Sequence, residues 1–212
     1  SGAMKPESQG PGRVPPTLVL ASASPRRTAL LDRWGLPHTV DPAGTPEEVL
    51  SGETPEAHVE RLAREKAVAV AARHPGSLVL AGDTVVVVDD EILGKPEDAD
   101  HAAQMLRRLR GRGHLVLTGL ALAGSAPGVV RSRWDAARVV FRDLEESEIE
   151  AYLATGEPLD KAGGYGIQGF GGTLVTRVEG DYYTVVGLPA SGLVALLGEA
   201  GWRCAFGSLA PR

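Results

Sequence analysis

The feature that most constrains the fold is an apolar run of eleven residues, Leu78–Val88, that contains a single carboxylate, Asp83. Aliphatic and β-branched residues flank Asp83 on both sides, so the run predicts a buried β segment, which we expect Gly82-Asp83-Thr84 to interrupt. A turn between two strands is the plain interpretation, since Asp is common in turns. However, no other turn residues surround Asp83, and a carboxylate in apolar surroundings is unfavourable unless it is paired or binds a metal. We therefore favour a functional role for Asp83.

Around this run, strands and helices alternate along the 212 residues, with several hairpins. This order predicts an α/β protein in which helices flank a mixed, twisted sheet. The expected strands are 17–21, 78–88, 91–93, 114–123 and 129–141, followed by a hairpin of 173–178 and 181–186. The expected helices are 25–34 after Ser24, 55–73 after Thr54, 100–110, one from Asp143 to residue 155, and 189–201.

Composition limits the domain organisation and the class of protein. Residues 1–16 are rich in Pro and Gly and begin with an apparent expression scar, so we expect a disordered leader, one domain over 17–203 and a C-terminal tail over 204–212. The net charge of −5 argues against a nucleic-acid binder, and no apolar stretch is long enough to span a membrane. The single cysteine, Cys204, favours a cytoplasmic setting.

The segment Ser22-x-Ser24-Pro25-Arg26-Arg27 predicts a phosphate-binding helix start. Two arginines in a first helical turn meet the partial positive charge of that helix end, and a bound anion would resolve the conflict. The alternative is a capped helix with two solvated arginines, because such helix-dipole penalties are only about 0.3–1 kcal/mol.

Two lysines and two glutamates are further candidates for the site. Lys66 falls on the apolar stripe of its expected helix, where a lysine needs a partner or extends to water, and Lys95 lies on the rigid-looking Gly94-Lys95-Pro96 loop. Glu47 and Glu48 precede that helix in an irregular stretch. Together with Asp83 they could form an oxygen-ligand site for Mg²⁺ or Mn²⁺.

A dinucleotide-like motif, Gly-x-Gly-x-x-Gly at residues 164–169, does not have the strand before it and the helix after it that a Rossmann motif requires. A nicotinamide-dependent oxidoreductase would rest on this motif alone, so we reject it. The expected glycine-rich loop, 163–172, can instead close over a planar base through Tyr165 and Gln168, whose amide offers both a donor and an acceptor.

In combination, six segments resemble the Maf family of nucleoside triphosphate pyrophosphatases, in family order over residues 18–202. The resemblance implies an elongated, two-lobed fold related to the inosine triphosphate pyrophosphatases, with a central cleft. It also implies metal-dependent cleavage of a nucleotide to the monophosphate and pyrophosphate, and a homodimer. The segments are LASASPRR (20–27), REKA (64–67), GDTVV (82–86), GKP (94–96), LDKAGGYGIQG (159–169) and GDYYTVVGLP (180–189).

The resemblance also assigns roles to residues. Within the family an Arg-Thr-Gln set marks the branch that cleaves dTTP and UTP, and it matches Arg26, Thr84 and Gln168 here. Ala137 is a departure, because relatives often carry Thr at this position. Since the family has been linked to septum formation, a non-catalytic nucleotide-binding regulator is the alternative.

The mechanism that we expect from these roles has three parts. Asp83 and Glu48 hold the metal with help from Glu47, and Asp83 also activates the attacking water. Cationic side chains neutralise the phosphates, and Ser22 and Ser24 contribute to the phosphate site. The cations are Arg26, Arg27, Lys66 and Lys95.

Overall fold

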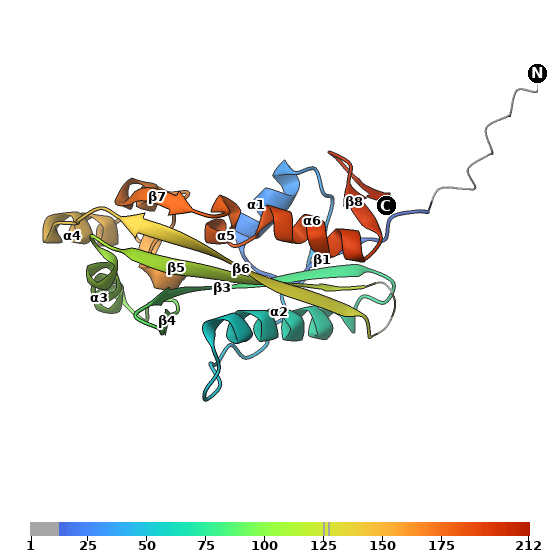
Figure 1. The fold of residues 1–212 in the computed structure, drawn as a ribbon, viewed down its shortest axis with the longest axis horizontal. Coiled ribbons are helices and arrows are strands. Elements are labelled where there is room, and N and C mark those ends of the chain that lie inside the picture. The colour runs from blue at the N-terminus through green and yellow to red at the C-terminus, as the bar shows by residue number, and fades with distance from the viewer. Residues whose placement is uncertain (1–12, 125, 127) are drawn as a thin grey trace, which may run out of the picture.

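A twisted seven-stranded sheet runs along the length of the molecule (Figure 1). The computed structural model describes residues 13–124, 126 and 128–212, so most of the leader expected over residues 1–16 lies outside the described residues. The strand order is β2-β1-β3-β5-β6-β7, with β4 paired to β3, and it combines parallel β2-β1-β3 pairing with antiparallel pairing elsewhere. The strands are β1 Leu18–Leu20, β2 Thr39–Val40, β3 Leu78–Val88, β4 Glu91–Leu93, β5 Gly113–Ala123, β6 Val130–Phe141 and β7 Val175–Glu179.

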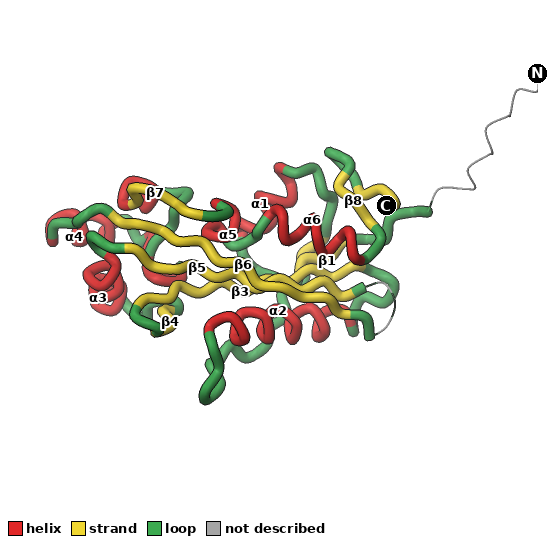
Figure 2. Tube along the Cα trace, viewed as in Figure 1, coloured by secondary structure: helices red, strands yellow, loops and turns green. Residues whose placement is uncertain are grey.

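Helices cover both faces of this sheet, which confirms the predicted mixed α/β class (Figure 2). The longest, α2, lies along one face, and α1, α5 and α6 lie on the opposite face, while α3 and α4 lie at the far end (Figure 1). The helices are α1 Pro25–Arg33, α2 Pro55–Ala71, α3 Ala99–Leu109, α4 Glu146–Ala154, α5 Tyr182–Val186 and α6 Ala190–Glu199. Three short 3₁₀ turns, η1 Glu157–Asp160, η2 Ala162–Gly164 and η3 Phe170–Leu174, shape the glycine-rich region.

The central strand β3 passes through Gly82-Asp83-Thr84 without a break, so the expected interruption is wrong. The register with β5 is continuous across this point, because Asp83 pairs with Gly119 and Thr84 pairs with Thr118. The backbone therefore keeps its ladder of hydrogen bonds, and the carboxylate of Asp83 projects from the middle of the sheet rather than from a turn.

The prediction of a second hairpin strand over residues 181–186 is also wrong, because residues Tyr182–Val186 form the short helix α5. The side chain of Asp181 caps this helix by accepting a hydrogen bond from the Tyr183 amide at 2.8 Å, and Gly187 ends it with a φ of 115°. Aromatic and β-branched residues favour strands by intrinsic preference, and here the capping and the packing outweigh that preference.

The helix starts at Ser24 and Thr54 are confirmed, since each hydroxyl accepts a hydrogen bond from a first-turn amide. The start expected at Asp143 is wrong. Glu145 is the N-cap of α4 instead, and it forms a reciprocal capping box with Glu148. The two glutamate side chains thus take the place of the Ser or Thr that usually marks the start of a helix in a sequence.

Two large hydrophobic clusters lie toward the two ends of the sheet. One gathers α1, α6 and the β1 end, including Leu30, Leu196 and Trp202, and the other gathers α3 and α4, including Leu106 and Phe141. In the segment assigned to a tail, residues 204–212, the strand β9 Leu209–Pro211 pairs with β8 Trp202–Cys204. The two clusters make the two lobes of the elongated molecule.

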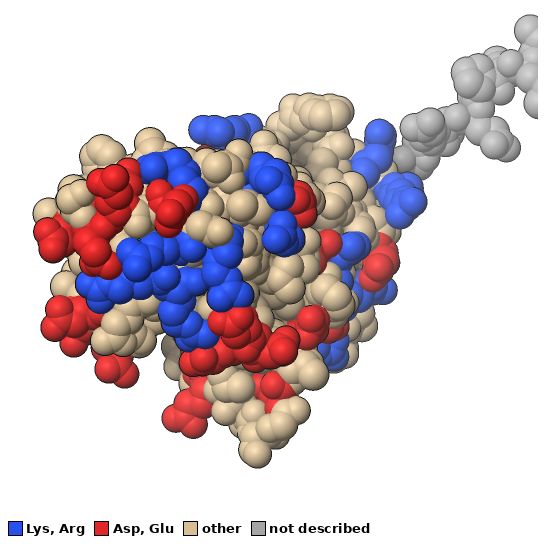
Figure 3. Space-filling view, turned by 60° about the vertical axis from the view of Figure 1, so that its left-hand side comes forward, with Lys and Arg blue, Asp and Glu red and all other residues tan. Residues whose placement is uncertain are grey.

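The surface carries both signs of charge. Figure 3 shows lysines and arginines gathered in one band, with aspartates and glutamates bordering it. Several arginines near the end of the sheet are paired, as in Arg107–Glu146 at 3.0 Å and Arg112–Asp89 at 2.6 Å. Among the described residues, no helix is long and apolar enough to cross a membrane.

Candidate active site

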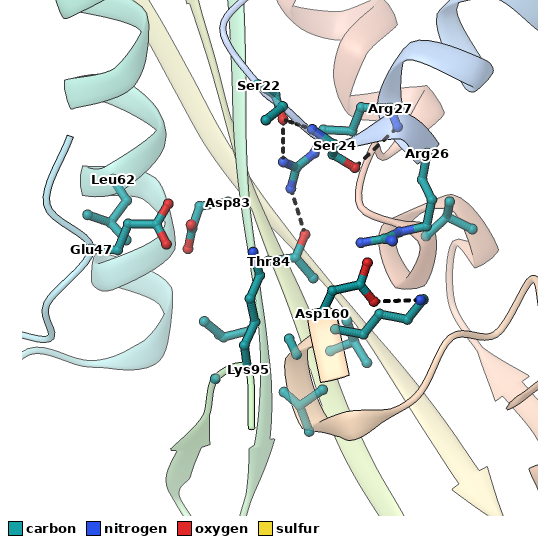
Figure 4. Close-up of a pocket in the computed structure, with 18 of the residues that line it drawn as sticks. Ser22, Ser24, Arg26, Arg27, Glu47, Leu62, Asp83, Thr84, Lys95 and Asp160 are labelled. Atoms are coloured by element: carbon teal, nitrogen blue, oxygen red, sulfur yellow. Dashed lines mark hydrogen bonds and ion pairs between the residues drawn. The ribbon is translucent and has the colours of Figure 1, made fainter. Parts of the chain in front are cut away.

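A cleft of about 760 Å³ lies at the middle of β3, within the size range of small-molecule sites. Eight separate parts of the chain line it, and Figure 4 shows side chains from several of them pointing toward a common space. They are the β1–α1 segment, the β2–α2 loop, the inner face of α2, β3, the segment of β4 and the loop after it, β5, the segment around residues 160–168, and the end of α5.

The centre of the cleft is an ion-pair cluster of one lysine and two carboxylates. Lys66 Nζ lies 3.1 Å from Asp83 Oδ1 and 2.7 Å from Glu47 Oε1. The side chains of Lys66 and Asp83 are 12% and 10% exposed, so this pair is largely removed from water, whereas Glu47 is 58% exposed. Lys66 thus has the partner that its place on the apolar stripe of α2 requires.

Glu47 is the acid that the β2–α2 loop brings to Asp83. Partial burial acts to raise the pKa of Glu47, but the hydrogen bond from Lys66 and the charges of Lys66, Lys95 and Arg27 outweigh it. The pKa of Glu47 therefore lies below its usual value. Glu48 is exposed and does not line the cleft, and its backbone carbonyl accepts a hydrogen bond from Arg61 at 2.9 Å.

The carboxylates of Glu47 and Asp83 both contact the ammonium of Lys66, so they lie at the same point of the cleft. Among the residues that the structure describes, no group of three or more His, Cys, Asp or Glu side chains is placed to hold a metal ion. Mg²⁺ commonly binds proteins through only one or two carboxylates and takes its other ligands from water and substrate phosphates. Glu47 and Asp83 therefore fit an ion that binds together with a phosphorylated ligand.

Arg27 is a buried connector rather than a free cation. Its Nε donates to the Gly187 carbonyl at 2.7 Å, its Nη1 donates to Ser22 Oγ at 3.0 Å, and its Nη2 donates to Thr84 Oγ1 at 3.1 Å. Burial lowers the pKa of the Arg27 guanidinium, and the nearby charge of Asp83 opposes that shift. Arg27 consequently joins the start of α1, the middle of β3 and the end of α5 into one wall of the cleft.

A chain of hydroxyl groups continues from Arg27 into the core. Thr84 Oγ1 lies 2.8 Å from Thr118 Oγ1, which in turn donates to the Thr184 carbonyl at 2.8 Å. Because Thr118 uses its proton on that carbonyl, Thr84 must donate to Thr118 while it accepts from Arg27. The hydroxyl of Thr84 is thus held in one orientation at the edge of the cleft.

The remaining cations face the cleft with fewer protein partners. Arg26 and Lys95 line it, and neither makes a side-chain hydrogen bond or an ion pair among the described residues. Asp160 and Lys161, which pair at 2.8 Å, also line the cleft. Both residues stand in the LDKAGGYGIQG segment that carries the resemblance, but residue-type reasoning gave them no role.

The two residues of the glycine-rich loop that were expected to contact a base, Tyr165 and Gln168, both line the cleft but differ in exposure. Gln168 is exposed and lines the cleft. Tyr165 is 6% exposed, and its hydroxyl bonds to His114 Nε2 at 2.7 Å, so its ring packs in the core against Phe141. Burial raises the pKa of Tyr165 and lowers the pKa of His114 to about 4, so both groups are neutral near neutral pH.

Ser22 and Ser24 line the cleft at the start of α1, but both hydroxyls already serve the local fold. Ser22 Oγ accepts from the Ser24 amide at 3.2 Å as well as from Arg27, and Ser24 Oγ accepts from the Arg27 amide at 3.5 Å. Each hydroxyl still has a proton to donate, which suits an anion at the helix start.

A cleft with cations around its rim and a carboxylate pair at its centre defines a protein that binds a phosphorylated small molecule. The chain belongs to the Maf family, since the family model described as "Maf-like protein" matches residues 17–200.

Named relatives of high similarity cover nearly the whole chain. It is 54% identical to the dTTP/UTP pyrophosphatase of Myxococcus xanthus over 190 residues, which are 88% of this chain and 95% of that protein. It is 50% identical to the dTTP/UTP pyrophosphatase of Moorella thermoacetica over 188 residues, 87% of this chain and 97% of the relative. A HAM1 protein structure from Coxiella burnetii covers 87% of this chain and 99% of its own, with a TM-score of 0.44 and 15% identity, too weak a likeness to add to the assignment.

Proposed function

We propose that this protein hydrolyses dTTP and UTP to the nucleoside monophosphate and pyrophosphate. The observation that carries the proposal is the Glu47–Lys66–Asp83 cluster at the centre of a cation-rimmed cleft. The extensive similarity to proteins named dTTP/UTP pyrophosphatase supports the choice of substrate.

Asp83 is the general base of the proposed reaction. It is anchored on a central strand, and the hydrogen bond from Lys66 orients its carboxylate. The oxygen of a water molecule attacks the α-phosphorus, the bond from that phosphorus to the bridging oxygen breaks, and Asp83 accepts the proton of the water. Pyrophosphate leaves with the electron pair of the broken bond.

Glu47 and Asp83 would hold a divalent cation, Mg²⁺ or Mn²⁺, so the ligand role expected of Glu48 passes to Glu47 in this proposal. When bound, the cation supplies positive charge to the phosphates and makes water more acidic. Lys66 holds the two carboxylates near each other before the ion and the nucleotide arrive.

The cations of the rim bind the triphosphate and stabilise the departing pyrophosphate. Arg26 and Lys95 have free guanidinium and ammonium donors for this purpose, at least within the described part of the chain. Arg27, with its hydrogen bonds to Ser22 and Thr84, shapes the wall against which the nucleotide lies. Gln168 contacts the base.

A nucleotide panel tests this proposal directly. We expect pyrophosphate release from dTTP and UTP in the presence of Mg²⁺ or Mn²⁺, slower release from CTP, ATP and GTP, and little release with excess chelator. Release of inorganic phosphate from UTP without pyrophosphate would place cleavage at the γ-phosphate and contradict the proposal. No turnover of any nucleotide would also contradict it.

The proposed setting is a cytoplasmic homodimer. The lone cysteine, Cys204, supports a reducing compartment. Exposed large side chains such as Trp134 and Val194 give the surface apolar area that a second copy could cover. Light scattering coupled to size-exclusion chromatography measures the mass, and a monomer at micromolar concentration would contradict the dimer.

A further inference from the structure

The loop that carries Gln168 is held by two side chains outside the cleft lining, Glu157 and Tyr152. Glu157 Oε1 accepts the Phe170 amide at 2.9 Å, and Glu157 Oε2 accepts the Gly171 amide at 2.9 Å. The hydroxyl of Tyr152 donates to Glu157 Oε2 and accepts the Gly166 amide at 3.0 Å. These two side chains thus fix both ends of the segment 166–171, with Gln168 between them.

Two glycines of this segment provide independent support, because the same side chains leave little room there for a Cβ atom. A Cβ on Gly169 would overlap Glu157 Oε1, and one on Gly171 would lie 2.6 Å from the hydroxyl of Tyr152 and 2.5 Å from the Gly166 carbonyl oxygen. The backbone therefore lies directly on the anchoring groups at these two positions. This close approach explains why glycine occupies positions 169 and 171.

Packing contributes little to the outer half of the segment, because Phe170 is 68% exposed and Gln168 and Gly169 are exposed as well. Its other hydrogen bonds are short-range ones, such as those from the Gly169 amide to the Gly166 carbonyl at 3.2 Å and from Thr173 Oγ1 to the Phe170 carbonyl at 2.8 Å. Ile167 packs against the two main hydrophobic clusters and holds the inner half. Glu157 is therefore the side chain that ties the outer half, and with it Gln168, to a distant part of the chain.

The amide of Gln168 offers one acceptor and a pair of donors, and by rotating it can match the hydrogen-bonding edge of either uracil or cytosine. Discrimination between these bases therefore requires that the loop hold the amide closely against the base. We propose that Glu157, assisted by Tyr152, is a positioning residue that sets pyrimidine selectivity through Gln168. This inference rests on the proposed function, because it refines how the same site chooses its substrate.

The first experiment compares Glu157→Gln with the wild-type protein for hydrolysis of UTP and CTP. The glutamine keeps the size but has only one acceptor oxygen, so one of the two loop amides loses its partner. The kcat/KM ratio of UTP to CTP should fall about tenfold, mainly through a higher KM for UTP with kcat little changed. Tyr152→Phe, a milder change, should lower the ratio in the same direction. Glu150→Gln, on the exposed face of α4, is the matched control and should leave the ratio unchanged.

A double-mutant cycle separates positioning through Gln168 from general damage. In a Gln168→Ala background, adding Glu157→Gln should not lower the UTP to CTP ratio further, because the group that Glu157 positions is already gone. If the two substitutions act additively, or if Glu157→Gln keeps the wild-type ratio, the proposal is wrong.

Two measurements read the same inference without catalysis. Hydrogen exchange of the Phe170 and Gly171 amides should be at least about tenfold faster in Glu157→Gln than in Glu150→Gln. Calorimetry with the uncleavable α,β-methylene analogues of UTP and CTP should show the same loss of discrimination in binding. Absence of pyrophosphate release by the wild-type protein would refute the proposed function, whereas unchanged exchange and unchanged binding discrimination would refute the role of Glu157.

Discussion

At the scale of single residues, the site depends on how the negative charge of Asp83 is compensated. A carboxylate on a central strand, 8% exposed, would be unfavourable without the ammonium of Lys66 beside it. Lys66 also contacts Glu47, so the three side chains carry a net negative charge that suits a cation. Each of the next two predictions removes one charged member of this cluster.

Asp83→Asn removes the base while it keeps the shape of the side chain. We expect kcat for UTP to fall by roughly 10²-fold or more, the lower range for loss of a general base. Asp90→Asn, the same change at an exposed turn position between β3 and β4, is the control and should retain full activity. Full activity in a folded Asp83→Asn protein would show that another group accepts the proton.

Lys66→Met removes the charge that lowers the pKa of Glu47. In the wild-type protein this lowered pKa keeps Glu47 ionised at pH values below the usual pKa of a glutamate. Without Lys66 the carboxylate is protonated at a higher pH, so the acid limb of kcat/KM should move up by about one pH unit. Lys95→Met, which removes a more distant charge, should move that limb less, and equal shifts in the two variants would contradict the assigned pairing.

Sequence reasoning found Asp83 and Lys66 because each is a charge in an apolar pattern, and the structure pairs them. It chose Glu48 over Glu47 as the main metal ligand, whereas Glu47 is the one that lines the cleft, since an irregular loop has no periodicity that tells which side chain faces inward. It also selected Tyr165, which borders the cleft but packs its ring against Phe141 and bonds its hydroxyl to His114. Local sequence does not reveal such distant partners.

At the scale of elements, α2 places Lys66 by packing directly on β5. The point of contact is Gly119, where an added Cβ would overlap the backbone carbonyl of Val59 and lie 2.8 Å from the Glu60 amide. Gly119 also pairs with Asp83 across the sheet, so the same position sets the distance from α2 to the catalytic strand. A larger residue there would displace the helix.

Gly119→Ala should therefore lower the free energy of unfolding by about 1–3 kcal/mol, the usual range for overpacking, and should also reduce activity because Lys66 moves with α2. Urea denaturation measures the first effect. Gly94→Ala, at a glycine with open space around its Cβ position, is the control for stability and should change it little. A Gly119→Ala protein as stable as that control would contradict the tight helix–sheet contact.

The elements themselves were largely predictable, and the main exception, α5, has a cause outside the local sequence. Ser24 and Thr54 mark helix starts that the structure confirms, because a cap is a local interaction. Helix α5 was predicted as a strand because its residues are aromatic and β-branched. Its helical form depends on the cap at Asp181 and on the hydrogen bond that Thr118 of β5 donates to the Thr184 carbonyl. Tertiary contacts decided that element.

At the scale of the whole molecule, two acids fasten the long β2–α2 loop to both ends of α2. Asp41 accepts hydrogen bonds from Arg73 and His74 at one end, and Glu53 accepts them from His58 and Arg61 at the other. Hydrogen bonds from Arg73 and His74 lower the pKa of Asp41 to about 2, and those from Arg61, Leu50 and His58 lower the pKa of Glu53 to about 2. Glu47 lies on the loop that they hold.

Because both pKa values are lowered in the folded protein, the stability that they contribute is present above the ordinary carboxyl pKa of about 4 and is lost as the pH falls toward 2. The urea midpoint should therefore drop over this range. The double variant Asp41→Asn/Glu53→Gln should be less stable at neutral pH and show a flatter dependence, whereas Glu97→Gln, at an exposed acid, should follow the wild-type curve. A wild-type slope in the double variant would contradict this linkage.

The unbroken course of β3, β5 and β6 past the cleft has a further consequence. The eleven-residue strands β3 and β5 contribute side chains to both hydrophobic clusters, and β6 pairs along the whole of β5, so the lobes share one continuous ladder of backbone hydrogen bonds. A hinge between them would have to break that ladder. The lobes therefore cannot clamp shut on a nucleotide as hinged domains do, and small-angle scattering should record the same overall dimensions before and after the ligand binds. Entry and exit are left to the loops at the rim of the cleft.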